Sequence, residues 1–219
     1  MPVTIRKQPR RSKAPGRERE RHWSRTDVVV CGVDEVGRGA WAGPLVAGAV
    51  ILDPESRFHG IRDSKLLLKA DRERIAAYVR RRAMAVGVGT VGIDEFNRLG
   101  LSRALREAGS RAVAALDAGP DRVLLDGRHD YFAGAHPCET IIKGDLTELC
   151  IAAASVVAKV HRDGLMRDLA EEYPEYGFHR NVGYGTLDHQ RALREHGPCD
   201  LHRRAWAPIA KLLQPKLTV

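Results

Sequence analysis

The 219-residue sequence has no run of the 18 or more apolar residues that a membrane-spanning helix needs. Its basic N-terminus has neither an apolar segment nor a cleavage site, so we expect no secretory signal. The four cysteines form no CxxC pair, and the nine histidines form no HExxH pattern. We therefore expect no zinc site. Widely scattered cysteines also favour a reduced, cytoplasmic setting.

The charge of the chain is concentrated at its N-terminus. Residues 1–25 hold nine Lys or Arg against two Glu, which is +7 of the total net charge of +8. We expect residues 1–26 to be a disordered tail, ahead of one folded domain over residues 27–219. A basic arm can add sequence-independent contacts to phosphates. A solvated tail with no role in function is the alternative.

Residues 28–52 read VVVCGVDEVGRGAWAGPLVAGAVIL. Two apolar runs separated by Gly37-Arg38-Gly39 and Gly43-Pro44 predict a hairpin of two buried strands. Asp34 and Glu35 lie near the end of the first strand. Burying such a pair is costly unless its charge is compensated, and a divalent cation is the usual compensation. The stretch therefore indicates a metal site.

Strand geometry limits how this pair can act. Neighbouring side chains on a strand point to opposite faces, so Asp34 and Glu35 can reach one ion only if the strand ends or bulges there. Gly37 and Gly39 let the backbone approach a ligand closely, and Arg38 carries a fixed positive charge suited to a phosphate. A solvated turn is the alternative for an isolated Asp-Glu pair. The whole run DEVGRG after a buried strand favours a site.

A second strand end repeats this design. Residues 122–126 form a short apolar run that ends in Asp126, followed by Gly127. The alternative is an ordinary Asp-Gly turn. Between the two motifs we expect a helix through Ile75 and Val79 and a strand over residues 84–93. A longer helix should follow, with Asp94 as its N-cap and with Gly100 and Gly109 arguing against an unbroken run.

A strand over residues 139–143 and a long helix from Leu146 to about Glu172 follow. Asp145 as N-cap with Glu148 three residues later fits a capping box. Ser155, Lys159 and Asp163 are spaced i, i+4 and i+8, so they form one stripe from which a carboxylate could reach the strand ends. A surface pair between Lys159 and Asp163 is the alternative.

The run GVDEVGRGAWAGPLVAGAVIL resembles the first signature of the ribonuclease HII family. Further blocks follow in the family's order, and the resemblance covers about residues 28–208: Asp63-Ser64-Lys65, the strand ending at Asp126, ASVVAKVHRD at 154–163, and the blocks YGF, GYGT and HRR. The GRG triplet, Asp163 and the short tail favour this family over ribonuclease HIII. Asn181-Val182 departs from the His-Lys pair that many members carry there.

The resemblance implies an α/β ribonuclease-H-like fold, with a mixed five-stranded sheet flanked by helices and a C-terminal helical extension from about residue 174. It implies a monomeric endoribonuclease of ribonucleotide excision repair. Such an enzyme hydrolyses the RNA strand of RNA–DNA hybrids and cuts 5′ to ribonucleotides embedded in duplex DNA, leaving 5′-phosphate and 3′-hydroxyl ends.

The resemblance also implies site residues. Two Mg²⁺ or Mn²⁺ ions would be held by Asp34, Glu35, Asp126 and Asp163, with Asp34 bridging both ions. Oxygen ligands select these metals over softer ones. The residues implied to contact substrate are Gly37, Arg38, Gly39, Ser64, Lys65, Lys143, Ser155 and Tyr184.

Two alternatives from other classes remain. A different nuclease or integrase of the same fold would share the carboxylates but not GRG and GYGT. A non-catalytic nucleic-acid-binding protein would have no need of strand-end carboxylates, which repel phosphate.

Overall fold

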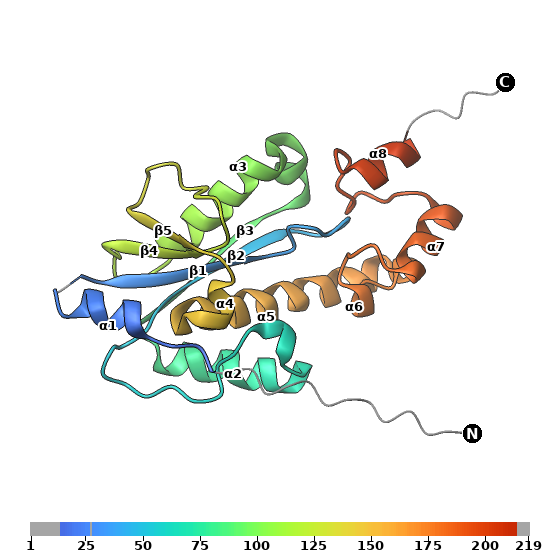
Figure 1. Cartoon of the computed structure of the whole chain (residues 1–219). Helices are drawn as coiled ribbons and strands as arrows, with labels where there is room; N and C mark the ends of the chain where they lie inside the picture. The colour runs from blue at the N-terminus through green and yellow to red at the C-terminus, as the bar shows by residue number, and fades with distance from the viewer. Residues whose placement is uncertain (1–13, 27, 214–219) are drawn as a thin grey trace, which may run out of the picture.

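The computed structural model describes residues 14–26 and 28–213. A five-stranded sheet of order β3-β2-β1-β4-β5 forms its centre, with helices on both faces (Figure 1). β1 pairs antiparallel with β2 and parallel with β4. The sheet is therefore mixed, as the sequence predicts. The strands are β1 (Val30–Val36), β2 (Leu45–Ile51), β3 (Ala85–Val91), β4 (Arg122–Asp126) and β5 (Cys138–Ile141).

Two long helices cover the sheet. α3 (Ile93–Ala114) lies on one face and α5 (Leu149–Glu172) on the other, with α2 (Lys69–Arg82) packed outside α5 (Figure 1). Glycines in the strands allow close approach of both helices. A Cβ on Gly48 of β2 would lie 2.6 Å from the carbonyl oxygen of Ala154, and one on Gly89 of β3 would collide with the carbonyl of Ala108. The helix backbones thus rest directly on the sheet.

Alternate residues of each strand face opposite helices. Val33 of β1 and Leu125 of β4 belong to the core under α3, whereas Val30 and Leu124 belong to the core under α5. Because the side-chain period of a strand is two, the last even-numbered positions of β1 and β4 that carry a carboxylate also face α5. Those positions are Asp34 and Asp126. The pleat therefore places both aspartates on one side of the sheet and Glu35 on the other.

The start of α3 differs from the prediction. Its N-cap is Gly92, which makes no side-chain cap, so Asp94 lies in the first turn and is not the N-cap. Gly100 has φ 72° and ψ 170°, so the helix is interrupted at this residue, as predicted. Gly109 stays helical, and a Cβ there would lie 2.6 Å from the ring of Tyr131. Gly109 therefore allows the aromatic ring to pack closely against the helix, and it does not interrupt the helix.

The second long helix is divided in two. α4 (Gly144–Thr147) and α5 are separated by Glu148, whose backbone is extended. The predicted capping role of Asp145 is wrong, because Lys143 in the left-handed region precedes the helix and Asp145 lies in its first turn. The helix is interrupted at Glu148 because the backbone of Gly16 pairs there as in a β-sheet. The N–H of Gly16 donates to the carbonyl of Thr147 (2.7 Å), and the carbonyl of Gly16 accepts from the N–H of Leu149 (2.9 Å).

The predicted disorder of residues 1–26 is wrong for residues 14–26, and residues 1–13 lie outside the described part of the chain. Residues Glu18–Ser24 form α1, which lies beside the start of β1 (Figure 1). Glu20 is 5% exposed and accepts a hydrogen bond from the N–H of Cys150 (2.9 Å). Arg17 donates to the carbonyls of Asp53 (2.8 Å) and Ser56 (2.6 Å). These charged side chains order the segment because both are buried and each bonds to main-chain groups elsewhere in the fold.

The C-terminal part adds short helices at the far end of the sheet, which confirms the predicted helical extension (Figure 1). They surround a third core that includes Met166, Phe178 and Ile209. The remaining helical segments of the described residues are η1 (Ser64–Leu66), η2 (Pro174–Tyr176), α6 (Phe178–Asn181), α7 (Leu187–His196) and α8 (Ala207–Leu213).

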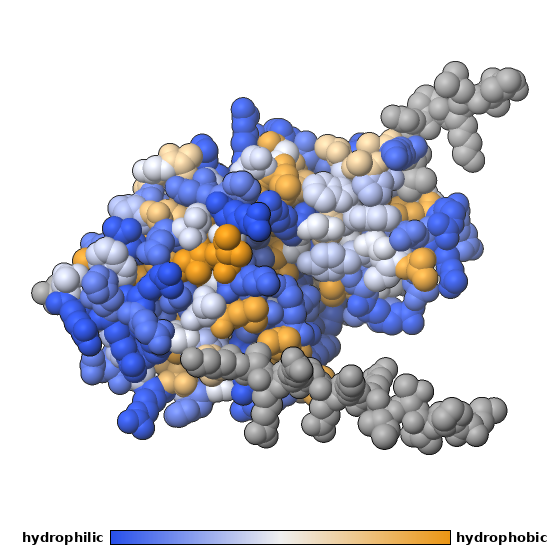
Figure 2. Space-filling model, viewed as in Figure 1, coloured by the Kyte–Doolittle hydropathy of each residue, from blue (hydrophilic) through white to orange (hydrophobic). Residues whose placement is uncertain are grey.

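The molecular surface shown in Figure 2 is mostly hydrophilic, with hydrophobic residues in small separate patches. Among the described residues, no helix has the length and apolar character needed to cross a membrane.

Candidate active site

Three aspartates meet at one edge of the sheet. Asp34 comes from β1, Asp126 ends β4, and Asp145 lies in the first turn of α4. One carboxylate oxygen of each lies within 4.8 Å of the others. β1 and β4 are parallel neighbours, so their carboxyl ends reach the same edge. The edge therefore gathers three negative charges, of which Asp34 and Asp145 are buried.

The charges in this group disfavour one another. Burial raises the pKa of Asp34 well above its ordinary value, and the neighbouring charges of Glu35 and Asp126 raise it further. Burial also raises the pKa of Asp126, as does the charge of Asp145, against a hydrogen bond from the N–H of Gly144 (2.7 Å). Such a group is stabilised by a cation. An all-oxygen donor set fits a hard divalent ion such as Mg²⁺ or Mn²⁺.

Glu35 lies on the opposite side of the strand from these aspartates. β1 neither ends nor bulges at the acidic pair, because Asp34 pairs with Gly48 and Glu35 with Ala47 in regular register. Burial raises the pKa of Glu35, opposed by Arg38, whose Nη1 lies 3.5 Å from Oε1. Its Oε2 atom is buried and has no hydrogen-bond partner among the described residues. An unpartnered buried carboxylate oxygen beside an acidic cluster also fits a bound cation.

Asp163 is not part of the group formed by the three aspartates. Its carboxylate binds Nζ of Lys159 (2.7 Å) and lies 3.9 Å from Arg72. The surface-pair alternative therefore describes its contacts, and the structure brings Asp145 to the cluster instead. Sequence reasoning missed Asp145 because an acidic residue before an apolar run also fits an N-cap. The signal that could have found it is the one used for Asp126, an aspartate and a glycine just after a strand.

A cleft of 420 Å³ opens next to these carboxylates. It brings together seven of the eight residues predicted to contact substrate. The eighth, Lys143, is exposed and does not line the cleft. The lining residues are Asp34, Glu35, Val36, Gly37, Arg38, Gly39, Ser64, Lys65, Ser155, Lys159 and Tyr184.

Contacts across the cleft fix the residues contributed by η1. The hydroxyls of Ser64 and Ser155 lie 3.0 Å apart, which ties η1 to α5. Asp63 caps η1 by accepting from the N–H of Lys65 (2.9 Å). Nζ of Lys65 lies 3.1 Å from Oδ2 of Asp145. The cleft therefore joins a basic side chain directly to the aspartate cluster.

The turn that begins with Gly37-Arg38-Gly39 is joined by main-chain hydrogen bonds to the segment that carries Tyr184. The carbonyl of Gly183 accepts hydrogen bonds from the N–H groups of Trp41 (2.8 Å) and Ala42 (3.1 Å). Asn181, which departs from the family pattern, is buried and accepts from the N–H of Gly183 (2.8 Å). Its amide also donates to the carbonyl of Tyr176 (2.6 Å). Asn181 therefore shapes the segment that carries Tyr184.

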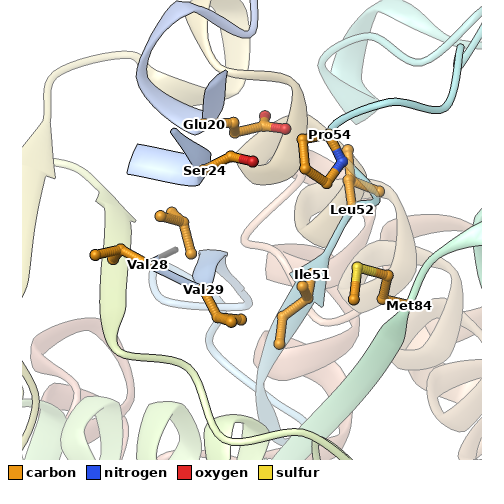
Figure 3. Close-up of a pocket in the computed structure, with 9 residues that line it drawn as sticks. Glu20, Ser24, Val28, Val29, Ile51, Leu52, Pro54 and Met84 are labelled. Carbon is orange, nitrogen blue, oxygen red and sulfur yellow. The ribbon is translucent and has the colours of Figure 1, made fainter. Parts of the chain in front are cut away.

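A second cavity, of 230 Å³, lies at the other end of β1. Figure 3 shows Glu20 and Ser24 of α1 on one side of it and Val28, Val29, Ile51 and Met84 on the other. Its lining is mainly apolar and includes one carboxylate, that of Glu20, which is already bonded to Cys150. This cavity has none of the clustered acidic groups of the cleft.

The sequence and fold are similar to those of known ribonucleases. The family model described as Ribonuclease HII matches residues 31–209. The chain is 44% identical to ribonuclease HII of Chlamydia caviae over 186 residues, which cover 84% of this chain and 87% of that protein. It is 41% identical to ribonuclease HII of Burkholderia lata over 211 residues, which cover 96% and 98% of the two chains.

Solved structures show the same architecture. The crystal structure of ribonuclease H2 from Pyrococcus horikoshii OT3 superposes with a TM-score of 0.72 at 26% identity, covering 84% of this chain and 96% of that one. Bst-RNase HIII in complex with Mn²⁺ superposes with a TM-score of 0.63 at 21% identity, covering 85% and 69%, and supports the fold alone.

Proposed function

Because the chain belongs to the ribonuclease HII family, and is therefore an endoribonuclease that acts on RNA–DNA hybrids, we propose that it hydrolyses the RNA strand with two divalent ions. We also propose that it cuts 5′ to ribonucleotides embedded in duplex DNA, leaving 5′-phosphate and 3′-hydroxyl ends. The observation that carries the proposal is the cluster of Asp34, Asp126 and Asp145 beside a cleft lined by the GRG turn and Tyr184.

The metal ligands in this proposal are four carboxylates. Asp34, Asp126 and Asp145 would hold the ions from the α5 side of the sheet, and Glu35 would contribute its unpartnered oxygen from the α3 side. Asp145 is proposed as the fourth carboxylate in place of Asp163, which the family resemblance implied. When bound at these carboxylates, Mg²⁺ or Mn²⁺ would supply positive charge to activate the attacking water and to stabilise the leaving 3′-oxygen.

The basic groups of the cleft would hold the nucleic-acid backbone. Arg38, Lys65 and Lys159 line it, and each can neutralise a phosphate. Lys65 is joined to Asp145 in this structure, and a cation bound by Asp145 would leave Lys65 available for a phosphate.

Ribose would be distinguished from deoxyribose by its 2′-hydroxyl, the group absent from DNA. The Gly37-Arg38-Gly39 backbone lines the cleft and can approach a sugar closely because its glycines carry no Cβ. Tyr184 presents a ring to the same cleft and can stack on the sugar that follows the ribonucleotide.

The deciding experiment is cleavage of a DNA duplex that carries one ribonucleotide, in Mg²⁺ or Mn²⁺, compared with an all-DNA duplex and an RNA–DNA hybrid. We expect cuts 5′ to the ribonucleotide and none in DNA. Asp145→Asn should abolish cleavage, whereas Asp163→Asn should retain most of it. If Asp163→Asn abolished cleavage and Asp145→Asn retained it, Asp163 would be the fourth ligand. Absence of cleavage by the wild-type protein would reject the proposed function.

A further inference from the structure

Two arginines beneath the cleft are completely buried without acidic partners. Arg162 of α5 and Arg203 of the loop before α8 are both 0% exposed. Within residues 14–26 and 28–213, each donates only to main-chain carbonyls and forms no ion pair. Buried arginines are normally paired with a carboxylate, because desolvating the charge is costly. Charge pairing therefore does not explain why these two arginines are buried.

Arg162 ties the turn that carries the GRG triplet to the segment that carries Tyr184. It donates to the carbonyls of Pro44 (2.8 Å), Ala42 (3.1 Å) and Val182 (2.8 Å). Its guanidinium carbon also lies 5.5 Å from the centroid of the Tyr184 ring, which is cation–π distance.

The backbone of the turn packs directly against the Arg162 side chain at Gly37. A Cβ on Gly37 would collide with Nε of that arginine. One side chain thus contacts both predicted sugar-binding elements, the GRG turn and Tyr184.

Arg203 holds the middle of the same turn. It donates to the carbonyls of Arg38 (3.1 Å), Gly43 (3.1 and 3.2 Å) and Pro44 (3.3 Å). Its guanidinium stacks on Phe96 of α3, 4.1 Å from the ring centroid. Burial and the charge of Arg162 lower the pKa of Arg203 to about 9, so it remains charged at neutral pH.

The contact with Arg38 determines where one N–H group points. In a trans peptide the C=O of one residue and the N–H of the next point in opposite directions, and the described chain has no cis peptide. With the Arg38 carbonyl held by Arg203, the N–H of Gly39 must point away from Arg203. Gly39 lines the cleft, and we infer that its N–H, turned away from Arg203, is directed toward the cleft. A cation on the carbonyl also polarises this peptide, which makes its N–H a stronger donor.

We propose that Arg162 and Arg203 are positioning residues for sugar discrimination, and the inference rests on the proposed function. Arg203 orients the Gly39 N–H toward the 2′-hydroxyl. Arg162 fixes the turn against Tyr184 so that donor and ring act on neighbouring sugars. Glycines alone would leave this backbone free to adopt many conformations. The two arginines supply the rigidity that the sequence of the turn lacks.

The test uses Arg162→Lys and Arg203→Lys, which keep a basic group but replace a rigid fork of donors by a single amine. Arg167→Lys and Arg204→Lys are matched controls, because these arginines are exposed or half-exposed and pair with Glu73 and Asp200. Binding is measured in Ca²⁺, used as a non-catalytic ion, to a duplex with one ribonucleotide and to the all-DNA duplex. Cleavage kcat and KM are measured in Mn²⁺, and melting temperature and Mn²⁺ affinity are measured alongside.

We expect the Lys variants to lose about tenfold of the binding preference for the ribonucleotide duplex, the effect of one hydrogen bond. Their kcat should fall by about ten- to a hundredfold, as expected for a misplaced substrate, with KM nearly unchanged. Mn²⁺ affinity and binding to all-DNA duplex should match those of the control variants.

Unchanged preference and kcat in both Lys variants would overturn the inference, as would an equal loss of Mn²⁺ affinity and all-DNA binding, which would indicate a structural role only. If neither variant folds, Gly37→Ala replaces them. Its methyl group must displace the Arg162 guanidinium, so it should show the same selective loss, and an unchanged preference would reject the inference. Failure of the wild-type protein to cleave would instead reject the proposed function.

Discussion

Nζ of Lys65 lies 3.1 Å from Oδ2 of Asp145, although the lysine side chain is 74% exposed and the aspartate side chain 7%. The lysine thus places one cation beside three clustered carboxylates. Burial lowers the pKa of Lys65, but the hydrogen bond to Asp145 and the charge of that carboxylate outweigh burial and raise it overall. The charge of Lys65 in turn offsets a small part of the rise in the pKa of Asp126. A metal ion and Lys65 therefore compete for the same negative charge.

Lys65→Met should raise the affinity for Mn²⁺ and weaken substrate binding. Removing an exposed competing cation should increase Mn²⁺ affinity by about two- to fivefold, the range for a solvent-screened ion pair. The KM for a hybrid should rise, because one phosphate contact is lost. Titration calorimetry and steady-state kinetics measure the two effects. Lys69→Met, which changes an exposed lysine at the start of α2, is the control and should alter neither value. A lower Mn²⁺ affinity in Lys65→Met would contradict this competition.

Asp34→Asn should stabilise the metal-free protein while abolishing cleavage. The pKa of Asp34 is raised in the folded state, so folding favours its protonated form. The stability of the metal-free wild type should then fall as pH rises from about 3.8 through the raised pKa. The Asn variant lacks this loss, and its melting temperature at pH 7 should be higher by about 2–4 °C per kcal/mol recovered. Mn²⁺ should raise the melting temperature of the wild type much more than that of the variant. Equal stabilisation of both by Mn²⁺ would remove Asp34 from the metal site.

Much of this site could be predicted from residue order, and the remainder depends on long-range geometry. Apolar runs ending at Asp34 and Asp126 predicted two strand ends, and both strands form where expected. The extra contribution of Asp145 was hidden because capping and metal binding use the same residue type. Arg162 and Arg203 were not found because charged residues are usually exposed. Most of their partners are carbonyls 118–165 residues away, which no local pattern records.

The N-terminal segment shows the same limit. Its basic composition is typical of disorder, yet residues Glu18–Ser24 form a helix. The decisive contact is between Glu20 and the N–H of Cys150, separated by 130 residues. Composition describes the average preference of such a segment, whereas one buried carboxylate with a long-range partner determines its structure here.

Tyr184→Ala should lose far more activity on an embedded ribonucleotide than Tyr184→Phe. The ring supplies stacking on the sugar and lies over the Arg162 guanidinium, and both contacts survive in phenylalanine. The loss for Ala should be about ten- to a hundredfold, corresponding to one stacking contact of about 1–3 kcal/mol. Both variants should bind Mn²⁺ normally. Single-turnover cleavage of a duplex with one ribonucleotide measures the effect. Wild-type rates in Tyr184→Ala would shift sugar recognition to the glycine-arginine turn alone.

The buried pair His189 and His202 should make the C-terminal extension sensitive to acid. Their Nε2 atoms lie 3.0 Å apart. The N–H of Cys199 donates to Nδ1 of His202, and Nδ1 of His189 lies 2.9 Å from the carbonyl of Tyr184. This arrangement requires both rings to be neutral, with His202 donating to His189. Burial and the neighbouring His189 lower the pKa of His202 to about 4.

A histidine whose pKa is lower in the folded state destabilises the fold on protonation. The stabilisation is complete above the unfolded pKa of about 6.5 and is lost as pH falls toward about 4, a difference of roughly 3 kcal/mol. Melting temperatures of the wild type and His202→Gln from pH 8 to pH 4 isolate this contribution from that of the carboxylates. The wild type should lose more stability over this range than the variant. His196→Gln, which changes a half-exposed histidine of α7, is the control and should follow the wild type. Parallel curves for His202→Gln and wild type would refute a role for the pair.

Two N-terminal truncations should separate binding from stability. Residues 1–13 hold five basic side chains and lie outside the described part of the chain, whereas residues 14–25 pack on the start of α5. Deleting residues 1–13 should leave melting temperature and kcat unchanged and reduce the salt dependence of duplex binding, by a slope of about 0.9 per lost phosphate contact. Deleting residues 1–25 should also lower the melting temperature, because it removes the buried Arg17 and Glu20 and leaves the N–H of Cys150 without its carboxylate. Fluorescence anisotropy over a salt series and thermal denaturation measure both effects. An unchanged salt slope after the shorter deletion would remove the basic residues from binding, and equal melting temperatures of the two truncations would show that α1 does not stabilise the fold.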